Sequence, residues 1–498
     1  MSSPTDQPRS ALRELLVIAG PTVATMTSYT VMTFTDKWLV SHLGASFVGA
    51  QGNGGLAAWV PQSVAMGVLQ VINTYVSQNM GAGRAQRGAA YAWNGVWIAW
   101  IFAVLFIPYS FALPWIFAEA GIEHEQAGLA ASYGQVLLFG ASLNLSTRAI
   151  SQFFYGMHKA NVVLVAGVTA NIVNLFASGI LVFGNGPVPA DLGLFGRAIG
   201  EIGQWLAIKP QGMIGSGYGT VLATLVELAI PLALFLSPKF NRLYKTRGAW
   251  RPSWPHIRDL FKTGWPGGLM FGNEMVCWGF FMVYLVSGFG AQHASAGWIA
   301  HQYMSLSFMP SVGLSVACTA IVGKYMGAKQ PHVAASRAWL SVKLAMVYMG
   351  LCGVVFVVFR RELVEFFVDP ATPAADRDQL IRLGAQMLIA TACFQLFDAV
   401  AMVLSGALRG AGDTIFPGIA TVISSWVVIV GGGLFMTKVF PGLQSLGPWI
   451  AAACYIATLC VILLLRFTSG KWKSIDLLKH ASGEPLQAKA STTDGVMS

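Results

Sequence analysis

Long apolar segments recur along almost the whole chain, each near the ~20 residues that an α-helix needs to cross a bilayer. Their pattern predicts about twelve membrane-spanning helices in two groups of six. The first group covers residues 12–40, 55–79, 89–117, 133–157, 161–184 and 213–236. The second group covers residues 256–289, 296–323, 336–359, 380–405, 414–437 and 447–467. The alternating ~10-residue segments of a membrane β-barrel do not occur, so the predicted fold class is an all-α polytopic membrane protein.

The two groups of spans predict two six-helix lobes, residues 1–238 and 256–470, joined by a basic linker at 239–255. The tail, residues 471–498, is polar, and we expect it to be disordered. The interrupted stretch 194–211 is too short to span. It suits either a short helix lying on the outer membrane surface or an ordered external loop.

Charge is scarce and unevenly placed. The chain has 498 residues, of which 55% are hydrophobic and 10% are charged, whereas soluble proteins carry about 25% charge. The net charge of +10 does not indicate nucleic-acid binding, because seven Lys and Arg residues gather between Lys239 and Lys262, where the two halves join. By the positive-inside rule this joint and both termini are cytoplasmic. We expect a multi-pass protein of the inner (plasma) membrane that acts as a monomer.

The two halves repeat each other. The segment from Met80 to Trp93 is identical to the segment from Met326 to Trp339 at six of fourteen positions, at an offset of 326 − 80 = 246 residues. Pro21 and Pro266 open the two halves at an offset of 245. Two matches in the same order favour an internal duplication, which gives two lobes in parallel orientation. Repeat-built transporters bind substrate between such halves.

Two carboxylates of the second half lie in otherwise uncharged apolar stretches. No Asp, Glu, Lys or Arg lies between Lys262 and Glu274 or between Glu274 and Lys324, and the nearest charges to Asp398 are Arg382 and Arg409. A carboxylate at bilayer depth costs about 3 kcal/mol on insertion scales, so such residues are functional candidates.

We expect these two acids to bind a proton or a sodium ion reversibly, because either ion relieves the repulsion between two carboxylates. Gln395 precedes Asp398 by three residues on the same helical face, and its carbonyl oxygen would add a ligand. Asn273 adjoins Glu274 but points ~100° away around the helix, so it is the weaker candidate.

The first half carries a different set of charges. Asp36, near the end of the first span, is expected to be a proton- or cation-sensitive group, although an ion pair with the adjacent Lys37 would also explain it. Arg148 in the fourth span needs a counter-ion if it faces the interior. Asp36 and Glu227 are the candidates within the same lobe. By the repeat, Asp398 corresponds to Arg148, and Glu274 corresponds to Ser28 or Tyr29.

Several of these motifs together resemble the multidrug and toxic compound extrusion (MATE) family. They are the Ala19-Gly-Pro21 start of the first span, the run Met309-Pro-Ser-Val-Gly, and Ser405-Gly-Ala-Leu-Arg-Gly-Ala-Gly-Asp-Thr414. The resemblance covers roughly residues 12–467 and is greatest to the NorM-type branch. It implies export of cationic and amphipathic compounds in exchange for sodium or protons. It also implies a cation site in the C-terminal lobe at the positions of Glu274 and Asp398, and a further cation or proton site at Asp36.

Pro21 and Pro266 are expected to act as helix hinges, because a proline inside a helix frees a carbonyl and permits bending. Arg148, Glu227 and the 194–211 stretch depart from the family pattern. The expected partners are small amphipathic or cationic substrates and the lipid bilayer, and no cofactor is expected beyond the coupling ion.

Two other functions are compatible with parts of the sequence. A flippase for lipid-linked saccharides would need several arginines for a pyrophosphate, and the first half offers mainly Arg148. An intramembrane aspartyl protease is suggested by Gly410-Ala-Gly-Asp413, with Asp398 as the second acid. That hypothesis is weak because Asp413 adjoins Arg409 in an expected turn. Phosphate-binding and dinucleotide-binding motifs do not occur, so we expect no enzyme and a transport cycle that is driven by an ion gradient.

Overall fold

The computed structural model describes residues 10–368 and 373–479, and this part of the chain contains helices and no strands. Membrane-length segments of the first lobe are α1 (Ala11–Ser41), α2 (Ala45–Leu69) with α3 (Val71–Gly81), α4 (Gly88–Glu119), α5 (His124–Phe139) with α6 (Ala141–Gly156), α7 (Ala160–Phe183) and α9 (Met213–Phe235). Its short elements are η1 (Ala85–Arg87), η2 (Ala190–Leu192), α8 (Gly193–Trp205) and α10 (Pro238–Tyr244).

The second lobe repeats this plan. Its longer segments are α11 (Trp254–Phe280) with η3 (Phe281–Val286) and η4 (Ser287–Phe289), α12 (Ala291–Gly327), α13 (Pro331–Val358), α15 (Ala374–Ala411), α16 (Ile415–Ser424) with η5 (Ser425–Gly431) and α17 (Gly432–Val439), and α18 (Leu446–Thr468). Its short elements are α14 (Arg360–Glu365), η6 (Pro441–Leu443) and η7 (Lys471–Ser474).

The prediction of twelve spans in two lobes is confirmed. Eleven helical segments of the described chain are long and apolar enough to cross a membrane. The remaining predicted span, 133–157, is the pair α5 and α6, which are 16 residues each and meet at Gly140. Each is shorter than a bilayer crossing, but the two together have the required length.

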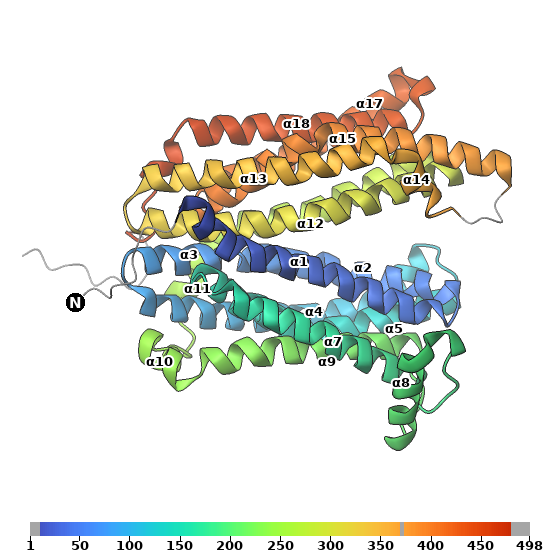
Figure 1. Cartoon of the computed structure of the whole chain (residues 1–498), viewed down its shortest axis with the longest axis horizontal. Coiled ribbons are helices and arrows are strands. Elements are labelled where there is room, and N and C mark those ends of the chain that lie inside the picture. The colour runs from blue at the N-terminus through green and yellow to red at the C-terminus, as the bar shows by residue number, and fades with distance from the viewer. Residues whose placement is uncertain (1–9, 369–372, 480–498) are drawn as a thin grey trace, which may run out of the picture.

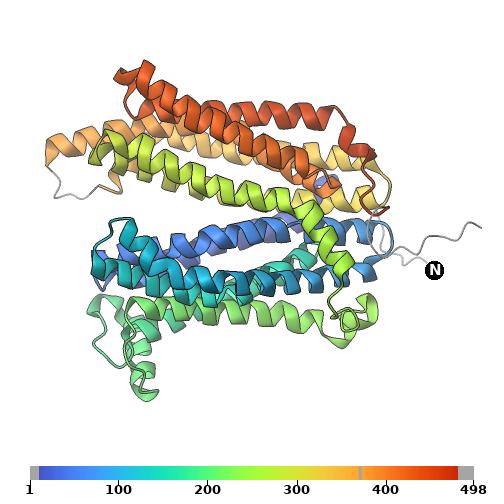
Figure 2. The same ribbon diagram turned by 180° about the vertical axis from the view of Figure 1, so that it is seen from behind.

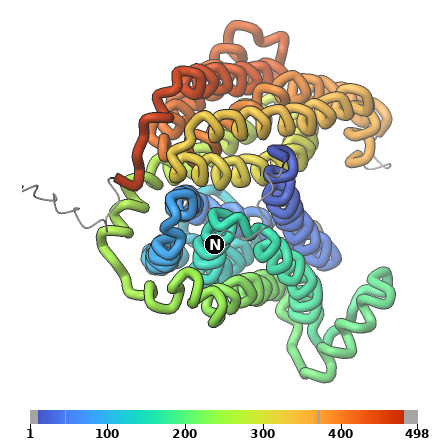
Figure 3. The backbone as a smooth tube through the Cα atoms, turned by 60° about the vertical axis from the view of Figure 1, so that its left-hand side comes forward, coloured from blue at the N-terminus to red at the C-terminus, as the bar shows by residue number. Residues whose placement is uncertain are grey.

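Figure 1 shows the two lobes as two layers, with the first lobe in blue and green and the second in yellow to red. The N-terminal end of the bundle is here the end at which α1 begins. The chain passes from one lobe to the other at this end, through α10 and the start of α11 (Figure 2). Seen from another side, α1 lies beside the yellow helices of the second lobe, and it packs on α12 (Figure 3).

Glycines let the lobes touch backbone to backbone at the N-terminal end. A Cβ atom on Gly81 of α3 would lie 1.8 Å from the carbonyl oxygen of Lys324, and one on Gly327 of α12 would lie 1.9 Å from that of Gln78. Gly81 and Gly327 are related by the repeat offset of 246, and so are Gln78 and Lys324. Because each lobe makes the same contact on the other, the duplication inferred from the sequence is also a near two-fold relation in space.

The segment 194–211 begins as a short helix, as one of the two sequence interpretations proposed. Helix α8 projects from the side of the first lobe at the end opposite the N-terminal end (Figure 1). Its buried residues are Gly196, Ile199 and Gly203, while Leu194 and Trp205 are largely exposed. The face of α8 that packs on the first lobe is therefore narrower than the apolar face that the sequence pattern of this helix presents.

The prediction of a disordered tail from residue 471 is wrong for residues 471–479. Trp472 is fully buried, stacks on Phe467, and donates its indole N–H to the Phe467 carbonyl. Lys329 forms an ion pair with Asp476 and lowers the pKa of that carboxyl group. One aromatic anchor in a polar segment was enough to dock it. The rest of the predicted tail, 480–498, lies outside the described residues.

The glycine contacts give a first testable prediction. Gly81→Ala and Gly327→Ala should each lower the free energy of unfolding by about 1–3 kcal/mol, because the added methyl group overlaps a backbone carbonyl that must move. Thermal unfolding of the purified protein measures the effect. Gly20→Ala in α1 is the matched control, since nothing lies within 4 Å of its added Cβ. Equal melting temperatures for all three variants would contradict the close approach.

Candidate functional site

The two isolated acids of the second lobe come together in the structure. Glu274 on α11 and Asp398 on α15 are partly buried, and their carboxyl groups lie within Coulombic range of each other. Tyr455 of α18, which is buried, lies within Coulombic range of both. Neither carboxylate accepts a hydrogen bond or forms an ion pair within the described part of the chain. The pair therefore combines two like charges and lacks the compensation that buried carboxylates normally have.

Gln395 presents a free carbonyl oxygen on the same face of α15. Its Nε2 atom donates to Ser307 Oγ at 2.9 Å, and Ser307 itself donates to the carbonyl of Met304 at 2.8 Å. Because the serine proton is already used, the amide must present its NH₂ group to the serine, which fixes its orientation. Its Oε1 atom is buried and finds no donor among the described residues. An unpartnered buried acceptor suits a cation ligand.

Asn273, the weaker candidate, is held elsewhere. Its Nδ2 atom donates to Ser425 Oγ at 2.8 Å, and its Oδ1 atom accepts from Trp426 Nε1 at 2.7 Å. Ser425 and Trp426 open η5, which is a π-helical stretch, and η3 on the other helix is a second one. Such stretches break the regular helical ladder and often occur near functional sites. Asn273 thus ties two irregular helices together beside Glu274.

The oxygen atoms at this place suit a small hard cation or a proton. Two carboxylates and an amide carbonyl are ligands of the kind that hard cations take, although most such sites use additional oxygens. No group of three or more His, Cys, Asp or Glu side chains arranged for a metal ion occurs in the described ranges. The donor set therefore fits sodium or a shared proton better than a transition metal.

In the first lobe, Asp36 is buried and fully hydrogen-bonded. Its Oδ1 atom accepts from Asn174 Nδ2 at 3.1 Å and Ser178 Oγ at 2.9 Å, and its Oδ2 atom accepts from Thr220 Oγ1 at 2.8 Å. Lys37 is exposed, so the alternative of an ion pair between the two neighbours is not supported. Three neutral donors from α7 and α9 stabilise a carboxylate at this depth.

Arg148 has Glu227, and not Asp36, as its charge partner, and Tyr29 lies between the two. The Arg148 guanidinium lies 4.0 Å from the centre of the Tyr29 ring, and the Tyr29 hydroxyl donates to Glu227 Oε1 at 2.6 Å. The predicted set Asp36, Arg148 and Glu227 therefore divides into two separate groups. A cation over an aromatic face is stabilised by the ring quadrupole, and the acid balances the charge.

Both prolines predicted as hinges lie inside the helices that carry these groups. Pro21 is in α1 with Tyr29 and Asp36, and Pro266 is in α11 with Glu274. Each removes one backbone hydrogen bond from its helix. The hinge role stays a prediction.

The protease hypothesis fails on geometry. Asp398 lies inside α15, while Asp413 lies just beyond its end, so the two acids are about 20 Å apart along one axis at 1.5 Å per residue. Asp413 pairs instead with Arg466 at 2.7 Å. Two acids in this arrangement cannot share a catalytic water.

Comparison with known proteins identifies the family of the chain. A family model named MatE matches residues 21–179 and 273–433, which is more than half of the chain and includes Pro21, Glu274 and Asp398. The chain belongs to the MatE family.

Similar proteins match more than nine-tenths of the chain. A probable multidrug resistance protein NorM of Mesorhizobium japonicum is 27% identical over 467 residues, covering 92% of this chain and 94% of that relative. Another NorM, of Deinococcus radiodurans, is 27% identical over 473 residues, covering 94% and 97%. Among solved structures, the eukaryotic MATE transporter AtDTX14 has a TM-score of 0.78 at 17% identity, over 95% of this chain and 97% of that one. A MATE in the straight conformation gives 0.78 at 19% identity, over 92% and 96%.

Several residues around the MatE-family sites were missed by sequence reasoning. Asn174 and Ser178, four residues apart in an apolar span, formed a polar face that could have been noticed. Tyr29 and Tyr455 gave no such signal, because a tyrosine in an apolar helix looks like any other interfacial aromatic residue. Only the packing of α1 against α7, and of α18 against α15 and η3, brings them to the charges.

The contacts of Arg148 predict that Glu227, and not Asp36, is the acid that depends on it. Arg148→Met should lower the free energy of unfolding by up to about 3 kcal/mol, since it leaves Glu227 buried without a counter-charge. Adding Glu227→Gln should restore most of the loss. Adding Asp36→Asn should not, because Asp36 has its own three donors. Thermal unfolding of the four proteins measures this. A fully stable Arg148→Met protein, or rescue by Asp36→Asn alone, would contradict the assignment.

Proposed function

We propose that this MatE-family chain is a secondary active exporter of amphipathic organic cations, driven by antiport of sodium ions or protons. The observation that carries the proposal is the pair Glu274 and Asp398, which repel each other and have no hydrogen-bond donor or cation among the described residues. A bound sodium ion or proton supplies the missing positive charge. Gln395 Oε1 contributes a further oxygen ligand.

The acid pair couples ion binding to transport because its ion affinity differs between the inward-open and outward-open states of the two lobes. An ion drives a conformational change only by as much as its affinity differs between the two states. Movement of α11 relative to α15 changes the separation of the two carboxylates, and with it their affinity for the ion. The substrate binds the state that the ion disfavours, so export of one accompanies import of the other.

Asp36 serves as a second, proton-sensitive group in this proposal. Its three donors favour the charged form, and a proton arriving on the carboxylate would displace at least one of them. The groups that would move are on α7 and α9, which pack against each other and beside α1. Protonation would therefore loosen the packing of the first lobe.

The energy source in this proposal is the ion gradient. One charge that crosses 100 mV supplies about 2.3 kcal/mol, which is enough for more than tenfold accumulation of substrate. We place the protein in the inner (plasma) membrane as a monomer, with both termini on the cytoplasmic side. The basic joint at Lys239–Lys262 then lies on the same side.

The flippase alternative receives no support from Arg148. That alternative needs cationic side chains free to bind a pyrophosphate, and Arg148 is already balanced by Glu227 through Tyr29.

Neutralising the acid pair tests the proposal directly. Glu274→Gln combined with Asp398→Asn should reduce gradient-driven efflux of a fluorescent cationic dye, such as ethidium, to the level of cells without the protein, since no ion can then be bound and released. Real-time dye fluorescence in cells measures this. The control is Glu362→Gln with Asp378→Asn, which makes the same chemical changes at exposed positions. Efflux by the site variant at the wild-type rate, with equal amounts of folded protein, would refute the assignment.

The identity of the coupling ion follows from the same assay. Wild-type efflux is measured after the proton gradient is collapsed with a protonophore, and separately after the sodium gradient is removed. If one ion alone is coupled, removal of its gradient stops efflux and identifies the ion. If the site exchanges both ions, only the two treatments together stop efflux. Efflux that survives both treatments together would refute ion coupling.

A further inference from the structure

Two acidic side chains cross between the lobes at the N-terminal end of the bundle. Glu14 of α1 belongs to the first lobe and contacts the second, and Asp259 of α11 belongs to the second lobe and contacts the first. Their offset, 259 − 14 = 245, is the one that relates Pro21 to Pro266. The two acids thus hold equivalent positions in the duplicated scaffold.

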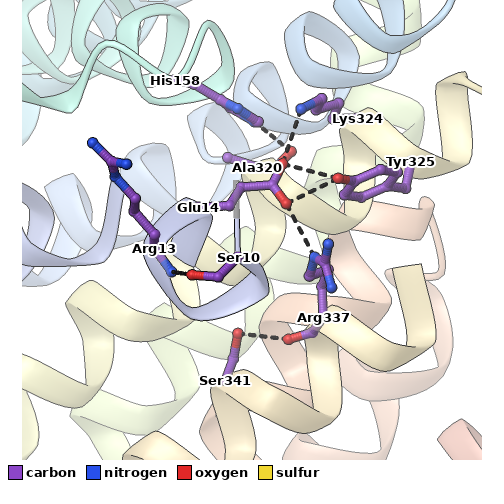
Figure 4. A network of polar contacts seen from close by, with 9 residues as sticks. All are labelled: Ser10, Arg13, Glu14, His158, Ala320, Lys324, Tyr325, Arg337 and Ser341. Carbon is purple, nitrogen blue, oxygen red and sulfur yellow. Dashed lines mark hydrogen bonds and ion pairs between the residues drawn. The ribbon is translucent and has the colours of Figure 1, made fainter. Parts of the chain in front are cut away.

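Glu14 is held by three donors from the second lobe (Figure 4). Its Oε1 atom accepts from Lys324 Nζ at 2.9 Å, its Oε2 atom accepts from Arg337 Nε at 3.0 Å, and the Tyr325 hydroxyl lies 2.9 Å from both oxygens. The Glu14 side chain is 14% exposed. Partly buried, charge-assisted bonds of this kind are stronger than exposed ion pairs.

Asp259 makes the equivalent crossing, and two tyrosines of the first lobe are among its contacts. Tyr91 of α4 donates to Asp259 Oδ2 at 3.2 Å, and Tyr75 of α3 donates to its backbone carbonyl at 3.2 Å. The two tyrosine rings stack at 4.4 Å, so they hold each other in place. Tyr91 and Arg337 are themselves related by the repeat offset of 246. Each acid therefore meets the side chain that the duplication places opposite it.

His158 adds a further contact across the lobes, but no charge. It follows α6 and bonds through Nε2 to the carbonyl of Ala320 at 3.1 Å (Figure 4). Burial lowers the pKa of His158 to about 4, so the ring is neutral near pH 7 and donates an N–H. The cations that face Glu14 are thus Lys324 and Arg337.

We propose that Glu14 and Asp259 form two separate latches that hold this end of the transporter shut. The inference rests on the proposed function, because a transporter with alternating access must separate its lobes here in half of its cycle. The contacts described above for Glu14 and for Asp259 come from different residues. Both are positioning residues, since they act through the orientation of the lobes and touch neither the ion nor the substrate.

The labelling rate of a cysteine in the lobe interface measures how often this end opens. Ser77 of α3 is fully buried, and a Cβ on Gly323 of α12 would lie 2.0 Å from its hydroxyl oxygen. Ser77→Cys therefore reacts with a membrane-impermeant thiol reagent only when the lobes part. The experiment uses the full chain in lipid nanodiscs, and the protein without Ser77→Cys gives the background from the six native cysteines.

Glu14→Gln should raise the labelling rate about tenfold, because it leaves two cations facing each other without an acid. Tyr91→Phe, which removes only the hydroxyl group, should raise it about threefold. The combination of these two should multiply the effects, as independent sites do. Glu14→Gln with Arg337→Gln should not multiply, since both residues belong to one latch.

Arg13→Gln is the matched control, because the Arg13 side chain points away from the Glu14 cluster in Figure 4. Labelling of Glu14→Gln at the control rate would overturn the first latch. A double variant with Tyr91→Phe that labels no faster than Glu14→Gln alone would overturn the second latch.

If Glu14→Gln elutes as an aggregate in size-exclusion chromatography, Arg337→Gln takes its place in the same comparison. The labelling needs no substrate or gradient, so a failure of dye efflux in the wild-type protein would refute the proposed function without deciding the latches.

Discussion

Close contact of the two lobes at one end of the bundle is the constraint on which the rest of the structure depends. Small residues bring α3 and α12 so near that side chains of one lobe bond to backbone carbonyls of the other: Asn73 donates to Val316, Gln78 to Gly410, and Thr74 to Arg409. Tight packing and hydrogen bonds, more than hydrophobic burial, hold helices together in a membrane. Helix α1 packs on α12, and α11 packs on α2 and α3, so both acid-bearing helices lie against the elements that make this contact.

The buried acids of the chain differ in how their charge is compensated. Asp36 has three neutral donors, Glu227 has a tyrosine hydroxyl with an arginine behind it, and Glu14 has two cations and a tyrosine. Each of these three carboxylates has hydrogen-bond donors within the protein. Glu274 and Asp398 have no such partners in the described chain, although Gln395 offers an unused carbonyl beside them. An incomplete arrangement is stable only when something outside the protein completes it, and for two carboxylates that is a cation or a proton.

Much of the fold, and part of the site, could be predicted from the sequence. The lengths of the apolar segments predicted the membrane spans, and the similarity of the Met80 and Met326 segments predicted the duplication. Both features can be read from short stretches of the chain. The isolation of Glu274 and Asp398 in apolar sequence pointed to the pair. The break at Gly140, the docking of Trp472 and the placement of Tyr29 between Arg148 and Glu227 were not predictable. Each depends on which helix packs beside it, and one sequence without its structure does not contain that information.

The duplication also explains why the two lobes differ in chemistry. At offsets of 245 and 250 residues, Glu274 corresponds to Tyr29 and Asp398 to Arg148. The members of each pair lie near each other, since the Arg148 guanidinium lies 4.0 Å from the Tyr29 ring and the two carboxylates lie within Coulombic range. One scaffold position therefore holds an acid pair in the second lobe and a cation–aromatic pair in the first. Arg148 carries a permanent charge, and Glu227 balances it within the protein. The acid pair has no permanent counter-charge. At this position, exchange of an ion with solution therefore changes the net charge of the second lobe and leaves that of the first lobe unchanged. We expect the coupling between ion binding and movement to be strongest in the second lobe.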